Sequence, residues 1–117
     1  MKKLLVLEPQ NVVAANLEKA LQGYEIFRTS SADQSLELAN DEEFDAIIIE
    51  LSLSGHSGFE FLYEFRSYAD WQDIPIIIYS IVNLSQEVLN SRSWQALNIH
   101  EYSYKPKSSL AQLTSTI

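Results

Sequence analysis

The centre of the sequence reads Ala46-Ile47-Ile48-Ile49-Glu50, a short apolar run that ends in an acidic residue. Two further runs have the same character, Leu4-Leu5-Val6-Leu7 and Ile74-Pro75-Ile76-Ile77-Ile78-Tyr79. A strand with one face in water alternates apolar and polar residues, whereas a strand buried on both faces reads as a continuous apolar run. We therefore predict three central strands of a parallel sheet.

Two weaker segments, Tyr24-Glu25-Ile26-Phe27-Arg28 and Ile99-His100-Glu101-Tyr102-Ser103, mix apolar and polar residues as edge strands do. Helical periods separate the five strands. The inward faces are expected to carry Val13, Leu17, Ala20 and Leu21, then Ala32, Leu36 and Ala39, then Phe59, Leu62 and Phe65. Hydroxyl caps are expected at Ser30 or Ser31, at Ser57 and at Ser85, and a last short helix from about Ser108.

Strand and helix alternate five times, which predicts a three-layer (βα)5 α/β fold with helices on both faces of a parallel sheet. The chain has 117 residues, of which 46% are apolar. That length suits one core, so residues 1–117 are expected to form a single domain.

Composition excludes several classes of function. Sixteen Asp and Glu against eight Lys and Arg give a net charge of −8, which disfavours direct contact with nucleic acid. The absence of cysteine excludes disulfide scaffolds and thiolate catalysis and suits a reducing compartment. The opening apolar run ends at Glu8-Pro9, too early for a signal peptide, and no run approaches the ~20 residues that span a bilayer. We expect a cytoplasmic protein without membrane contact.

Ligands of open parallel sheets bind beyond the carboxyl ends of the strands. The residues that end the predicted strands are therefore the candidate site: Glu8 with Pro9, Glu50, Ser80 with Ile81, and Lys105 with Pro106.

Two segments carry a resemblance to a known family. They are Leu51-Ser52-Leu53-Ser54-Gly55-His56-Ser57-Gly58-Phe59-Glu60 after the third strand and Glu101-Tyr102-Ser103-Tyr104-Lys105-Pro106 around the fifth. With these segments and the (βα)5 alternation of strands and helices, the chain resembles the response-regulator receiver (CheY-like) family over nearly its whole length. The resemblance implies the flavodoxin-like, doubly wound fold with strand order 2-1-3-4-5 and a role in two-component, phosphorelay signalling rather than as an enzyme.

The family transfers a phosphoryl group from a histidine kinase to an aspartate at the end of the third strand. Mg²⁺ assists, held by that aspartate and two acids after the first strand, because the ion neutralises charge on the transferring oxygens. The resemblance implies that Ser80 and Lys105 are the residues that would bind the phosphoryl oxygens. It also implies that Tyr102 is the aromatic residue that turns inward on activation.

The acceptor residues depart from the family pattern. Glu50 stands where the aspartate is expected, and its extra methylene moves the carboxylate by ~1.5 Å, which can cost on the order of 100-fold in a positioned reaction. Pro9 replaces the second metal acid and offers no side-chain oxygen. Ile81 is branched where the family has a small residue, and it is expected to cover the entrance used by a phosphodonor. Ser54 replaces a proline.

Glu50 is expected to pair with Lys105 and so to resemble the charge pattern of a phosphorylated aspartate. We interpret the chain as a pseudo-receiver that acts through protein contacts without phosphorylation, with no cofactor and no metal; Glu8 and Glu50 would be the ligands of any metal. The alternative is a working receiver that uses Mg²⁺ and a histidine kinase. A third interpretation of Glu8, Glu50 and Lys105 is a purely structural ion network. A flavin site is disfavoured, since Glu8-Pro9-Gln10-Asn11 lacks hydroxyls and glycines.

The aromatic surplus suggests a partner surface, because Phe61, Tyr68 and Trp71 remain once the expected face of the third helix is filled. By analogy with the family's dimerisation and output face, the candidate contacts for a kinase, an output domain or a second copy are Leu89, Trp94, Tyr102 and Tyr104.

His56 and His100 lack partners at metal-ligand spacing. The run Asp41-Glu42-Glu43 with Asp45 reads as a solvated turn.

Overall fold

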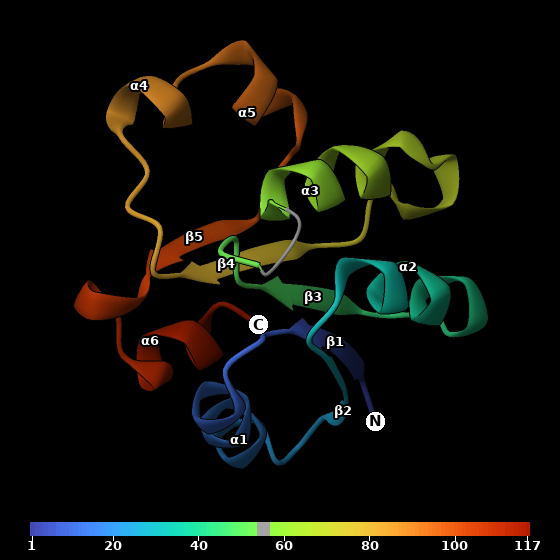
Figure 1. Cartoon of the computed structure of the whole chain (residues 1–117). Coiled ribbons are helices and arrows are strands. Elements are labelled where there is room, and N and C mark those ends of the chain that lie inside the picture. Colours follow the sequence, from blue (N-terminus) through green and yellow to red (C-terminus); the bar gives the residue numbers. More distant parts are fainter. Residues whose placement is uncertain (54–56) are drawn as a thin grey trace.

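A computed structural model describes residues 1–53 and 57–117, and shows one five-stranded parallel sheet in the order β2-β1-β3-β4-β5 (Figure 1). The strands are β1 (Lys3–Leu7), β2 (Glu25–Thr29), β3 (Ala46–Ile49), β4 (Ile76–Ser80) and β5 (Glu101–Tyr104). The helices are α1 (Asn11–Ala20), α2 (Ala32–Asp41), α3 (Gly58–Ser67), α4 (Gln86–Leu89), α5 (Arg92–Ala96) and α6 (Leu110–Ser115). Short 3₁₀ turns, η1 (Ala69–Trp71) and η2 (Lys105–Lys107), precede β4 and follow β5. The predicted fold class and strand order are confirmed.

The sheet separates two apolar cores. Leu5 and Leu7 face the core that holds Phe65 of α3, whereas Leu4 and Val6 face the core that holds Leu17 of α1. Figure 1 shows α2 and α3 on one face of the sheet and α1 and α6 on the other. Successive side chains of a strand point to opposite faces, so the central strands bury every side chain except Lys3 at the start of β1, which is half-buried. This is why they read as unbroken apolar runs.

Three strands begin later than predicted, β2 by a single residue, at Glu25 rather than Tyr24. β4 begins at Ile76 because Ile74 still belongs to the preceding turn, where its amide donates to Trp71 O at 3.4 Å. β5 begins at Glu101, after a turn in which Asn98 has a φ of 50°. The left-handed conformation of Asn98 reverses the chain between α5 and the last strand.

The predicted helix faces need three corrections. On α1, Ala20 is exposed and Ala14 is buried instead. On α2, Ser35 is fully buried while Leu36 is only half-buried, since the Ser35 hydroxyl bonds the Thr29 hydroxyl at 2.5 Å and donates to Ser31 O at 2.9 Å.

On α3, Phe61 is buried and Phe59 half-buried, the reverse of the prediction. Phe61 stacks on Phe65 one turn later, with ring centroids 5.6 Å apart, and both rings enter the core. The predicted caps at Ser31, Ser57 and Ser85 are confirmed, each accepting from a backbone amide of the first turn.

The segment expected as one fourth helix divides into α4 and α5. Ser91 causes the break, because its hydroxyl donates to Val88 O at 2.6 Å and accepts from Trp94 N at 3.3 Å. It thus closes one helix and caps the next. The last helix begins at Leu110 behind a capping box of Ser109 and Gln112, close to the predicted start.

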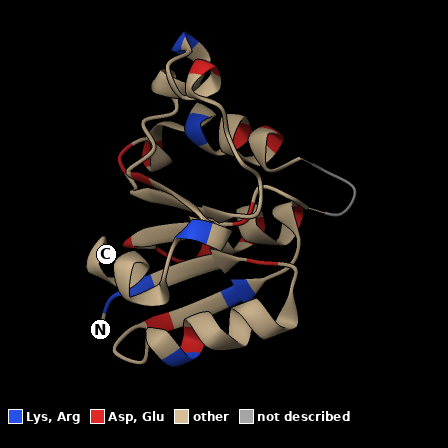
Figure 2. Cartoon of the chain, turned by 90° about the vertical axis from the view of Figure 1, so that its left-hand side faces the viewer, with Lys and Arg blue, Asp and Glu red and all other residues tan. Residues whose placement is uncertain are grey.

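Acidic residues lie on helices and loops all over the molecule, and basic residues are fewer (Figure 2). Among the residues that the structure describes, no helix has the length and apolarity to cross a membrane.

Candidate functional site

The carboxyl ends of β1, β3, β4 and β5 bring together the four polar residues that the sequence singled out. Lys105 Nζ lies 2.6 Å from Glu8 Oε1 and 2.6 Å from Glu50 Oε1. The side chains of Glu8 and Glu50 are only 2% and 3% exposed. Ser80, at the end of β4, is fully buried beside them. The expected ion pair of Glu50 and Lys105 is therefore present, and Glu8 shares the same ammonium.

Strand register explains this convergence. Leu7 pairs with Ile49, so the next residues, Glu8 and Glu50, leave the sheet side by side. Ser80 pairs with Tyr104, which places Lys105 one residue beyond the same edge. Residues separated by as many as 97 positions thereby meet at one end of the sheet.

The Glu50 carboxylate accepts four hydrogen bonds. Oε1 accepts from Lys105 Nζ at 2.6 Å and from the Ile81 amide at 3.0 Å. Oε2 accepts from the Ser52 amide at 3.0 Å and from the Ser80 hydroxyl. Its lone pairs are thus fully used, which fixes the carboxylate in one orientation.

The pKa of Glu50 lies below its ordinary value of 4.5. Burial by itself raises the pKa of the carboxyl, but the hydrogen bonds from Lys105, the Ser52 amide, Ser80 and the Ile81 amide outweigh burial and favour the charged form. Glu50 is therefore an anion at neutral pH.

Close packing joins the first residue of α3 to the backbone directly after Glu50. The Gly58 amide donates to Leu51 O at 2.9 Å, and a Cβ on Gly58 would lie 2.5 Å from Leu51 Cα. The first turn of α3 thus rests directly on the backbone after Glu50, at a distance that only glycine permits.

The comparisons with known proteins agree with this arrangement. The family model described as response regulator receiver domain matches residues 4–113. The chain belongs to the response regulator receiver domain family. Receiver domains are signalling modules of two-component systems, generally without enzymatic activity, and they interact with histidine kinases or output domains.

This receiver is similar to a curated protein in sequence and to solved structures in fold. The probable transcriptional regulator ycf29 of Cyanophora paradoxa is 25% identical over 89 residues, 74% of this chain and 42% of its own length. The chain therefore spans about two fifths of that relative. A sensor protein of Polaromonas sp. JS666 has a TM-score of 0.87 at 23% identity, with 98% of this chain and 91% of that chain covered. Chemotaxis protein CheY4 of Vibrio cholerae has a TM-score of 0.86 at 24% identity, with 99% and 95% covered. These two structures show the same fold.

The residues of this receiver do not fit the Mg²⁺ site that the family implies. Glu8 and Glu50 both direct Oε1 at the Lys105 ammonium, and Pro9 supplies no side-chain oxygen. The second oxygen of Glu8 accepts from the Gln10 amide at 3.0 Å. Among the described residues, no three His, Cys, Asp or Glu side chains group closely enough to hold a metal ion. A divalent cation placed at these oxygens would also face the positive charge of Lys105, which repels it.

Ile81 contributes to the site mainly through its backbone. Its amide binds Glu50 while its side chain is 58% exposed. Whether that side chain shields the site from a phosphodonor stays a prediction.

Arg28 is a residue that sequence reasoning missed: Nε and Nη2 donate to Glu8 O at 3.0 and 2.8 Å. Its position in an edge strand gave no signal of this contact.

Tyr102 connects β5 to the loop after β4. Its hydroxyl donates to Val82 O at 2.7 Å and accepts from the Leu84 amide at 2.9 Å. The ring meets Trp94 edge to face, with centroids 6.4 Å apart. The sequence indicated the importance of Tyr102 but not these two backbone partners.

The predicted partner surface needs correction. Trp94 is 7% exposed because it packs between Phe59 and Tyr102, so it is a core residue rather than a surface contact. Leu89, Tyr102 and Tyr104 are half-buried. Of the aromatic surplus near α3, Tyr68 is exposed as expected, whereas Phe61 and Trp71 are buried.

The remaining candidates of the sequence are two histidines, Ser54 and an acidic run. Ser54 and His56 fall outside the described residues. His100 Nε2 lies 3.1 Å from Thr116 O, near the carboxyl terminus. The acidic run is the predicted turn before β3, where Glu42 pairs with Lys3 Nζ at 2.7 Å and Asp45 accepts from the Lys3 amide at 2.8 Å.

Proposed function

We propose that this chain is a receiver that signals without phosphorylation, through contacts with a protein partner. Glu50 stands at the phosphoacceptor position in this proposal. The observation that carries it is the set of donors around the Glu50 carboxylate, which includes both residues that the family resemblance assigns to the phosphoryl oxygens, Ser80 and Lys105.

The longer side chain of Glu50 supports this proposal. A glutamate extends its charge ~1.5 Å farther than an aspartate, toward the place where a phosphoryl group on an aspartate would stand. Ser80 and Lys105 thus bind an anion that is part of the chain. An anion built into the sequence cannot be removed by a phosphatase, so the site would hold one state.

The state of Tyr102 is consistent with a fixed conformation. The half-buried ring is tied by its hydroxyl to two backbone groups of the loop that follows Ser80. We infer that the Glu50 carboxylate, acting through Ser80, helps to hold this loop, since the Val82 amide donates to Ser80 Oγ at 3.0 Å. The loop and the half-buried Leu89 and Tyr104 would then present one constant surface to a kinase, an output domain or a second copy.

A working receiver is the second candidate, and one observation favours it. The carboxylates of Glu8 and Glu50 lie at the same buried lysine, with a serine hydroxyl beside them. Phosphorylation would require Lys105 to release at least one carboxylate before a metal ion could bind. The cysteine-free composition suits the cytoplasm for either candidate.

Intact-protein mass after incubation with acetyl phosphate and Mg²⁺ separates the two candidates. We expect no phosphoryl adduct on the wild type and an adduct on the triple variant Glu50→Asp, Pro9→Asp, Ile81→Ala. The single variant Glu50→Asp is the matched control, because it restores the acceptor without the second metal acid. A phosphoryl adduct on the wild type would contradict the proposal. An adduct on Glu50→Asp alone would show that Pro9 and Ile81 are not the obstacle.

A further inference from the structure

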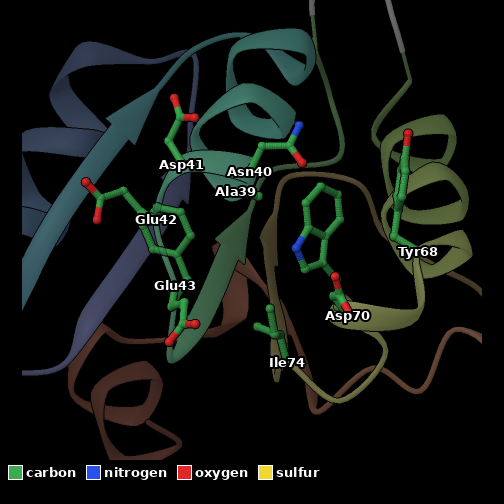
Figure 3. Close-up of a pocket in the computed structure, with 10 residues that line it drawn as sticks. Ala39, Asn40, Asp41, Glu42, Glu43, Tyr68, Asp70 and Ile74 are labelled. Carbon is green, nitrogen blue, oxygen red and sulfur yellow. The ribbon is translucent and has the colours of Figure 1, made fainter.

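A cleft of about 770 Å³ opens at the amino ends of β3 and β4, at the opposite end of the sheet from Glu50. The turn between α2 and β3 forms one wall, and the segment from the end of α3 through η1 forms the other (Figure 3). Its volume is typical of ligand pockets, which are about 300–1,000 Å³. The lining residues used below are Asp41, Glu43, Tyr68, Asp70 and Trp71.

The charge of the cleft is one-sided. Asp41, Glu43 and Asp70 are exposed, and none of them has an ion pair or side-chain hydrogen bond within the described part of the chain. Glu42 differs, because it forms an ion pair with Lys3 at 2.7 Å, and the Lys3 ammonium also attracts Glu43 from farther away. Unpaired carboxylates along one hollow produce a local negative potential that attracts cations.

Trp71 supplies a second and independent feature. It is 8% exposed, its ring stacks on Phe65 with centroids 4.8 Å apart, and it also meets the Tyr68 ring with centroids 4.7 Å apart. The Arg66 guanidinium fixes its backbone, donating to Trp71 O at 2.6 Å. The indole is therefore held rigidly in the wall of the cleft.

The indole N–H of Trp71 has no acceptor among the described residues, although Trp71 is more than nine-tenths buried. Every fully buried side-chain nitrogen or oxygen of those residues has a hydrogen-bond partner. Nε1 of Trp71 is therefore reached by solvent, and Trp71 lines this cleft. A rigid aromatic donor at the edge of a pocket is suited to a ligand that brings an acceptor.

We propose that this cleft docks a lysine- or arginine-bearing peptide segment of a partner protein. The cationic side chain would lie among Glu43, Asp70 and the exposed ring of Tyr68, where charge and cation–π attraction add. A backbone carbonyl of the segment would accept from Trp71 Nε1–H.

Other occupants match these features less well. A protonated polyamine satisfies the acids but has no acceptor for the indole N–H. A second copy of this chain carries the same net charge of −8, which opposes its approach to an acidic cleft. The proposal does not depend on whether Glu50 replaces a phosphoryl group, because the cleft lies at the other end of the sheet.

The test uses NMR of the intact chain labelled with ¹⁵N in its tryptophans. The chain has only two, so Trp94, which is buried elsewhere, serves as an internal control. The probe is an acetylated and amidated hexapeptide of alternating glycine and arginine. We expect the Trp71 indole signal to move downfield on titration while that of Trp94 stays in place. The same hexapeptide with citrulline in place of arginine keeps the carbonyls but lacks the charge, and is expected to bind about tenfold more weakly or not at all.

A pair of variants separates the cleft from overall charge. Glu43→Gln with Asp70→Asn should weaken binding of the arginine peptide about tenfold, and the effect should shrink at high salt. Glu18→Gln with Glu87→Gln removes the same charge from α1 and α4 and should leave the affinity unchanged.

Several outcomes would overturn the proposal. They are equal loss of affinity in the two double variants, equal binding of the citrulline peptide, and the absence of any shift at Trp71. Binding of a linear triamine as tight as that of the arginine peptide, without the indole shift, would identify the cleft as a small-cation site and also overturn it.

Discussion

The two ends of the sheet differ in how their charges are satisfied. At the carboxyl end, Lys105 lies between Glu8 and Glu50, and each of these carboxylates accepts from two or more donors. At the amino end, Glu43 and Asp70 border a cleft, and neither forms an ion pair or a side-chain hydrogen bond among the described residues. A buried network with every group paired holds a conformation, whereas unpaired charges around a hollow keep the capacity to bind. The presence of Glu8, Glu50 and Lys105 at the family's phosphorylation site is thus not by itself evidence for phosphoryl transfer.

Lys105→Met is expected to have the largest effect, because it would leave the carboxylates of Glu8 and Glu50 buried without a cation. Breaking a buried ion pair from one side costs about 3–5 kcal/mol. The free energy of unfolding, measured by urea titration, should fall by that amount. Lys107→Met is the matched control, since Lys107 is exposed, and should change stability by less than about 0.5 kcal/mol. Equal effects of the two variants would contradict a structural role for the Lys105 network.

Gly58→Ala tests whether the backbone beside Glu50 is as tightly held as the ion network. The added Cβ would meet Leu51 Cα at 2.5 Å, and relieving such a backbone clash costs about 1–3 kcal/mol of unfolding free energy. Gly23→Ala is the control, because nothing lies within 4 Å of the added Cβ. Thermal unfolding of both variants should show a lower Tm for Gly58→Ala alone. An unchanged Tm would mean that the loop after Glu50 yields easily.

The pH dependence of stability should reveal the charged state of Glu50. Its pKa in the folded chain is lower than the ordinary 4.5, so Glu50 stabilises the fold above that pH and the stabilisation is lost as the pH falls below it. Urea titrations between about pH 7 and about pH 3.5 should therefore show a steeper loss of stability for the wild type than for Glu50→Gln. Parallel curves would assign the acid sensitivity to other carboxyls.

The acids of the cleft should have the smallest effect on folding. Glu43→Gln with Asp70→Asn removes only exposed charges without partners, so the free energy of unfolding should stay within about 0.5 kcal/mol of the wild type. The loss of stability can be compared directly with that of Lys105→Met, since each variant removes charge, one at the amino end of the sheet and the other at the carboxyl end. A loss above about 1 kcal/mol would show that these acids stabilise the fold, and the contrast between the two ends would fail.

The apolar runs predicted the strands well, whereas particular side chains and one helix were placed wrongly from the sequence. Phe61 was expected to face outward, yet it is buried, because periodicity defines a stripe but not the angle at which a helix packs on the sheet. Trp94 was assigned to a partner surface on analogy, yet Phe59 and Tyr102 enclose it. The break between α4 and α5 is caused by Ser91, whose hydroxyl donates to Val88 O and accepts from Trp94 N. A pattern of apolar residues does not indicate such a break.

The sequence by itself determined the alternation of strands and helices and the four polar residues at strand ends, because the hydrophobic period is a property of the chain. The strand order that makes those strands neighbours was implied only by the family resemblance and is shown by the structure. The sequence also determined the pairing of Glu50 with Lys105, since opposite charges at the same buried edge must neutralise each other. Only the tertiary structure decided that Glu8 and Glu50 both contact Lys105 at 2.6 Å, and that the Trp71 indole N–H, without an acceptor among the described residues, belongs to a residue that lines a cleft with Glu43 and Asp70. Those features depend on packing angles and on distances between segments remote in sequence, which local patterns do not encode.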